Sequence, residues 1–126
     1  MSQDRPKLTA EDLLIYEVIE TQSKNKPIPG KRLVKLAQDR GVRLHARGIR
    51  EGIKRLRRND RLICSLPGIK GGYFIAQTKE AYEEFVRQEF QAKIIDMAIT
   101  LRAMNSTAKK EFGEFKQLHL NIDGLN

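Results

Sequence analysis

Apolar residues recur at helical spacing in the first third of the chain and predict two helices there. The first covers about residues 10–22, behind Thr9 and Asp12, which are spaced as in a capping box with an acid in place of Glu or Gln. A loop broken twice by proline follows. The second helix covers about 30–39, and Gly41 stands where a left-handed residue is expected to end it. Two short helices are therefore expected before residue 42.

The next segment predicts a third helix and then a β-hairpin. The helix runs from about His45 to Asn59, and its apolar stripe is formed by Ile49, Ile53 and Leu56. Two apolar, β-favouring runs follow at 61–66 and 72–76, separated by the turn-forming residues 67–71. The pattern thus gives three helices and a hairpin, in that order.

A long amphipathic helix is predicted after the hairpin. Its apolar positions step by three or four residues through Tyr82, Val86, Phe90, Ile94, Met97, Leu101, Met104 and Ala108. It would begin at Thr78, which can cap it, and end before Gly113, a length of about 34 residues or roughly 50 Å. From Ile94 to Ala108 the spacing resembles a coiled-coil seam. Either the helix packs back onto its own domain, or, as we favour, it pairs with a second copy in a homodimer.

The expected fold class is mainly α with a small β-hairpin. The chain of 126 residues divides into a domain over 8–77, the long helix over 78–113 and a tail over 114–126. Its 40% hydrophobic content is sufficient for a packed core. No apolar run is long enough for a membrane span and the N-terminus lacks a signal peptide, so we expect a cytoplasmic protein without a membrane partner.

Positive charge is concentrated in the middle of the chain. Residues 24–61 hold 14 of the basic residues and only three acids, a net charge of +11, whereas the whole chain carries +8. The rest of the chain is therefore slightly acidic. This asymmetry indicates a polyanionic partner, with a solvated basic face as the alternative.

The residues needed for catalysis or for metal binding do not occur in a usable pattern. Cys64 is the single cysteine and the two histidines are scattered, so neither a disulfide within the chain nor a zinc site is expected. No nucleophile–base arrangement and no nucleotide-binding glycine loop can be identified. We expect no enzyme activity, no cofactor and no metal.

Three helices, a hairpin and a basic third helix together resemble the winged helix-turn-helix family, over about residues 8–77. In that family the third helix enters the DNA major groove and the hairpin touches the flanking DNA. The resemblance places three basic residues at outward recognition positions of that helix: Arg47, Arg50 and Lys54. The other candidate DNA contacts are Lys31, Arg43, His45, Arg57 and, at the tip of the hairpin, Lys70.

The second hairpin strand, with glycines and aromatic residues over 71–76, further resembles small winged-helix proteins of bacterial viruses and mobile elements. The implied function is binding of double-stranded DNA in transcriptional regulation or in DNA replication. The alternative is a protein-interaction module that uses the same surfaces without DNA; RNA binding is a further possibility, because phosphate contacts do not separate RNA from DNA.

The C-terminal tail contains a hexapeptide, residues 117–122, that resembles the motif by which bacterial replication proteins dock into the DNA-polymerase sliding clamp. The matching residues are Gln117, Leu118, Leu120 and Ile122, the last in place of the usual Leu or Phe. Such a peptide would bind extended, with alternate apolar side chains in a groove. The tail could instead pack on the chain itself or on a second copy.

Overall fold

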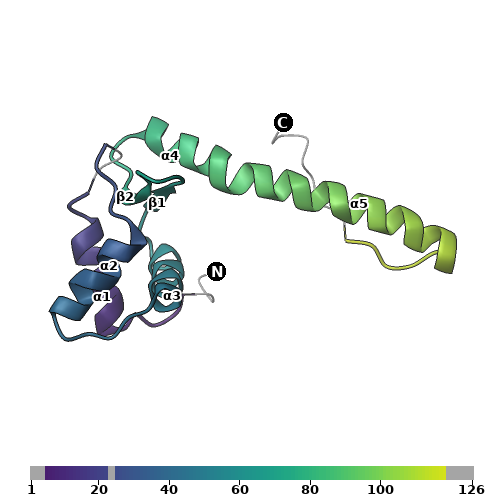
Figure 1. Cartoon of the computed structure of the whole chain (residues 1–126). Helices are drawn as coiled ribbons and strands as arrows, with labels where there is room; N and C mark the ends of the chain where they lie inside the picture. The colour runs from purple at the N-terminus through teal and green to yellow at the C-terminus, as the bar shows by residue number, and fades with distance from the viewer. Residues whose placement is uncertain (1–4, 23–24, 119–126) are drawn as a thin grey trace. The chain divides into compact units, whose positions relative to one another are not determined.

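The computed structural model describes residues 5–22 and 25–118, and it confirms the predicted fold class. Three helices come first: α1 (Ala10–Ile19), α2 (Gly30–Asp39) and α3 (Ala46–Arg57). A two-stranded antiparallel hairpin follows, made of β1 (Ile63–Leu66) and β2 (Gly72–Ile75). The long helical segment consists of α4 (Lys79–Val86), a π-helical turn η1 (Arg87–Gln91) and α5 (Ala92–Phe112) (Figure 1).

Local sequence signals explain most of the helix ends. Thr9 and Asp12 form the expected capping box, since each side chain accepts a hydrogen bond from the other residue's backbone N–H at 3.0 Å. Gly41 adopts the predicted left-handed conformation, with φ of 76°, directly after the last turn of α2. Thr78 caps α4 alone, because its hydroxyl accepts from the Ala81 N–H at 3.0 Å. The helix α5 ends before Gly113, as predicted.

Two helices are shorter than the sequence pattern indicates. The first ends at Ile19 instead of residue 22, and the Gln22 N–H donates to the Ile19 carbonyl in a turn. The third begins at Ala46, with His45 as the residue before its first turn, and ends at Arg57. These differences lie at helix ends, where a periodic pattern gives the weakest information.

The chain divides into two compact units, residues 1–82 and 83–126. In the first unit the three helices surround one apolar core, to which each helix and the hairpin contribute. Its buried members are Ile15, Ile19, Ile28, Leu33, Ile49, Ile53, Leu56 and Ile63. The hairpin adds Cys64 and Phe74, which are also buried.

A third segment joins the hairpin through Ile28, in the loop before α2. The Ile28 N–H donates to the Tyr73 carbonyl and the Tyr73 N–H donates to the Ile28 carbonyl, both at 2.8 Å. Gly72 makes this approach possible, since a Cβ there would lie 2.4 Å from the Ile28 carbonyl and its φ is 155°. The start of α2 is thereby tied to β2.

Candidate nucleic-acid interface

Helix α3 separates its apolar and basic residues onto opposite sides. Ile49, Ile53 and Leu56 are buried in the core. The three predicted recognition residues, Arg47, Arg50 and Lys54, are exposed, and their spacing of three and four places them along one outer face. Packing of the inner stripe therefore holds three cations toward solvent on a single helix face.

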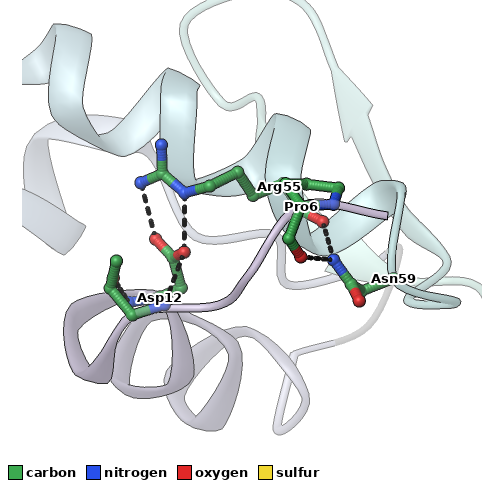
Figure 2. A network of polar contacts seen from close by, with 5 residues as sticks. Pro6, Asp12, Arg55 and Asn59 are labelled. Carbon is green, nitrogen blue, oxygen red and sulfur yellow. Dashed lines mark hydrogen bonds and ion pairs between the residues drawn. The ribbon is translucent and has the colours of Figure 1, made fainter. Parts of the chain in front are cut away.

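An ion pair fixes α3 against α1 (Figure 2). The Arg55 Nε donates to Oδ2 of Asp12 at 2.7 Å, and a second guanidinium nitrogen donates to Oδ1 at 2.9 Å. The Asp12 side chain is only 1% exposed, whereas that of Arg55 is about one-third exposed. Burial opposes ionisation of this carboxyl, but hydrogen bonds from Arg55 and Thr9 and the charge of Arg55 outweigh it and lower the pKa of Asp12.

Gly52 allows α1 and α3 to approach closely at this ion pair. A Cβ at this position would lie 2.8 Å from Oδ1 of Asp12 and 3.0 Å from Cδ1 of Ile15. Gly48 is less confined, since its Cβ would meet only the end of the Leu44 side chain, at 3.2 Å. Gly52 therefore serves helix packing, a role that the sequence alone left undecided.

The end of α3 also holds the segment before α1. The Asn59 side-chain amide donates to the Pro6 carbonyl at 2.6 Å and to the Arg55 carbonyl at 3.0 Å (Figure 2). Arg5 forms an ion pair with Asp60. Together with the Asp12 pair, these contacts anchor the C-terminal half of α3.

Three residues of the basic stretch make contacts within the unit. Besides Arg55, Arg57 donates from Nε to the Ile63 carbonyl at 2.8 Å and is half-buried, which connects the end of α3 to the start of β1. Arg61 lies over the Tyr16 ring, 5.1 Å from its centroid. Arg57 was a candidate DNA contact. In the structure its guanidinium instead bonds to the Ile63 carbonyl and is half-buried, so we assign it a role in packing.

The other candidate residues near α3 are exposed. Arg43 and His45 lie in the short connection before the helix, where they line an open cleft of about 470 Å³ with Gln38 and Gly41. His45 makes no side-chain capping bond to α3. Its ring is therefore available to solvent or to a partner.

A larger cleft, of about 780 Å³, lies between the N-terminal turn of α2 and the hairpin. Apolar parts of Leu66, Ile69 and Tyr73 line it, and three cations of α2 lie along it: Lys31, Arg32 and Lys35. All three are exposed. The sequence reasoning selected Lys31 but missed Arg32 and Lys35, although the spacing of Lys31 and Lys35 already placed them on one face of the predicted helix. Lys70 is exposed in the hairpin turn.

In the second unit, residues 114–118 run back along α5 (Figure 1). Gly113 has a φ of 75°, which a glycine adopts without strain. Gln117 is half-buried, and with Leu118 it lines a small cleft against Ala98, Leu101 and Asn105. The first two residues of the clamp-like hexapeptide thus lie on α5, while Leu120 and Ile122 lie outside the described residues.

The described residues offer little other reactive or metal-binding chemistry. Burial raises the pKa of the Cys64 thiol, which keeps it protonated as a small core residue. Among residues 5–22 and 25–118, no group of three His, Cys, Asp or Glu side chains could hold a metal ion. None of the helices described is both long and apolar enough to cross a bilayer.

Comparison with known proteins gives no further guidance: no protein-family model, no curated protein and no solved structure matches this chain.

Proposed function

We propose that this protein binds double-stranded DNA through its N-terminal unit, with α3 in the major groove and the hairpin against the flanking backbone. The observation that carries the proposal is the row of exposed cations Arg47, Arg50 and Lys54 on the outer face of a helix whose inner face is buried in the core. A single α-helix fits the width of the major groove. Arginine can pair with a guanine edge or a phosphate, and lysine neutralises a phosphate as a point charge.

The surroundings of α3 support the same proposal. The cations of α2 at the larger cleft and Lys70 in the hairpin turn offer further contacts to phosphates. Arg43 and His45 offer contacts at the start of α3. The ion pair of Asp12 with Arg55 holds the helix rigid, which reduces the entropy lost on binding.

In this proposal the protein acts in the bacterial cytoplasm, on bacterial, phage or plasmid DNA. It would occupy a site as a transcriptional regulator or work at the replication machinery. The clamp-like hexapeptide of the tail favours the role at the replication machinery, because it would tether the protein to the sliding clamp. Catalysis is no part of the proposal, because nothing in the described residues assembles a reacting group.

The test is fluorescence anisotropy of a labelled random-sequence duplex, titrated with the full chain at several salt concentrations. We expect micromolar binding that weakens with a log–log salt slope of about −4 to −6. The variant carrying Arg47→Ala, Arg50→Ala and Lys54→Ala is expected to reduce the magnitude of that slope by about three.

The matched control removes three exposed cations from the second unit, through Arg102→Ala, Lys109→Ala and Lys110→Ala. It changes the net charge equally, so an equal loss of binding in both variants would contradict a role for α3. Absence of binding at about 50 mM salt would overturn the proposal and favour the protein-interaction module. Circular dichroism of both variants verifies that the fold is retained.

A further inference from the structure

The second unit leaves a row of apolar side chains exposed. We name as the seam the six residues Phe90, Ile94, Met97, Leu101, Met104 and Ala108. Their spacing of four, three, four, three and four is that of the a and d positions of a coiled coil. Phe90 is 43% exposed, Ile94 38%, Met97 64% and Met104 65%, so in the described part of the chain four of the six seam side chains lie open to solvent, while Leu101 and Ala108 are half-buried.

The π-helical turn at the start of the seam keeps its apolar residues aligned. Steps of four residues drift around an α-helix, and the sequence has three in succession from Tyr82 to Ile94. A π-turn, with its i to i+5 hydrogen bonds, takes up one additional residue and corrects this drift. It also brings Phe85 and Phe90 into edge-to-face contact, with ring centroids 5.5 Å apart.

The last described residues, Gln117 and Leu118, lie mainly against a face of α5 beside the seam. Gln117 and Leu118 lie against Ala98 and Asn105, and Ala98 is 5% exposed. Of the seam residues, only Leu101 lines the same cleft. Up to residue 118, therefore, folding back leaves the seam open to a partner.

We propose that the seam pairs with the seam of a second copy of this chain, and that the two helices run antiparallel. In an antiparallel pair each a residue packs against a d residue of the other helix. One register aligns all six positions: Phe90 with Ala108, Ile94 with Met104, and Met97 with Leu101 of the second copy. The largest seam side chain then faces the smallest one, which keeps the thickness of successive layers even.

Parallel pairing is less favourable because of the sizes of the seam side chains. It would place Phe90 against Phe90 and leave a poorly filled layer between two Ala108 side chains.

The contact area sets the expected affinity. From the exposed fractions of the seam, pairing buries on the order of 1,000 Å² in total, near the lower limit for a specific interface. We therefore expect a dissociation constant in roughly the micromolar range, so that the state of the protein depends on its concentration. This inference does not rest on DNA binding.

The first experiment is sedimentation equilibrium of the full chain from about 1 to 200 μM, a range that spans the expected affinity. The mass should rise from 14.5 kDa toward twice that value. Met97→Glu places a charge at the centre of the seam and should weaken dimerisation by about a hundredfold. The matched control, Ile99→Glu, changes an apolar residue of α5 that is 55% exposed but lies off the seam, and it should leave the dimer intact.

Orientation is tested by cysteine cross-linking in full-length chains. A mixture of Ile94→Cys and Met104→Cys chains should form a disulfide-linked heterodimer on oxidation, whereas each variant alone should not. Cross-linking of each variant to itself would show parallel pairing and overturn the proposal, as would failure of the mixture to cross-link. A monomer at 200 μM, or equal disruption by Met97→Glu and Ile99→Glu, would overturn the pairing itself. Duplex binding of Met97→Glu, measured in parallel, reports separately on the proposed function.

Discussion

The two units of this protein differ in how far their apolar side chains are buried. In the N-terminal unit, a cluster contributed by three helices and the hairpin is almost completely shielded from solvent, and cations occupy the outside. In residues 83–118 of the second unit, Phe85 and Ala98 are buried, while Phe112 and four of the six seam residues are exposed. The first unit has the core of an independent domain, and the second has an apolar surface without a core. We infer that the first unit is stable alone and that the second is completed by association.

The strongest way to break this comparison is to separate the units. A fragment of residues 1–82 is expected to keep a cooperative thermal transition within about 5 °C of that of the full chain. A fragment of residues 83–126 is expected to be largely unfolded at low micromolar concentration, because an isolated helix is only marginally stable in water. Circular dichroism at increasing concentration checks both expectations. Full helicity of the second fragment that does not depend on concentration would contradict the inferred need for a partner.

Within the first unit, the largest expected effect of a single substitution is that of Asp12→Ala. It removes both the partner of Arg55 and the capping box of α1, and should lower the free energy of unfolding at pH 7 by about 2 kcal/mol. The cost stays moderate because the Arg55 side chain is partly exposed and can regain water. Urea denaturation measures the change, and Glu11→Ala, at the exposed neighbouring acid, is the control.

The same pair predicts a loss of stability in acid. The pKa of Asp12 in the folded protein is below the ordinary value of 3.8, so its contribution is complete above that pH and disappears as the pH falls through the folded pKa. The difference in unfolding free energy between wild type and Asp12→Asn should therefore shrink between about pH 5 and pH 2. A difference that is independent of pH would show that Asp12 acts without its charge.

A smaller effect separates the two glycines of α3. Gly52→Ala should cost about 1–2 kcal/mol, because its Cβ would overlap the Asp12 carboxylate and Ile15. Gly48→Ala should stay within about 0.5 kcal/mol of wild type, since a flexible side-chain end can move and alanine favours the helix. Equal effects of the two substitutions in urea denaturation would show that close packing against α1 is not limiting.

Local and periodic features of this fold could be predicted from the sequence. The range of α2, the left-handed Gly41, the capping box of Thr9 and the end of the long helix before Gly113 all depend on residues close in the chain. The buried stripe of α3 followed in the same way from its spacing. The helix ends depend on the backbone preferences of single residues, and the buried stripe depends on the spacing of apolar residues. Both can be read from one sequence.

Contacts between distant residues could not be predicted. Asp12 and Arg55 are 43 positions apart, and Arg55 has the same local pattern as its exposed basic neighbours. The pairing of Ile28 with Tyr73 was hidden in a loop rich in proline, because one pair of backbone bonds leaves no alternating pattern. The sequence placed Arg47, Arg50 and Lys54 outward, as the structure has them, but it also counted Arg57 as a DNA contact, because its bond to the Ile63 carbonyl depends on where the following strand lies.

Substitutions in the C-terminal tail should have the smallest effect on stability, but they test a specific protein partner. The clamp-docking prediction requires residues 117–122 to bind extended, so Gln117 and Leu118 must first leave α5. Leu118 is 66% exposed, so releasing it from α5 should cost little free energy. A free peptide of residues 114–126 should therefore bind a purified clamp only a few-fold more tightly than the full chain.

The variant that combines Gln117→Ala with Leu120→Ala should abolish clamp binding of the full chain and change its unfolding free energy by less than about 0.5 kcal/mol. Lys116→Ala is the matched control, and equal capture of the double variant and wild type by the clamp would leave packing along α5 as the role of this segment.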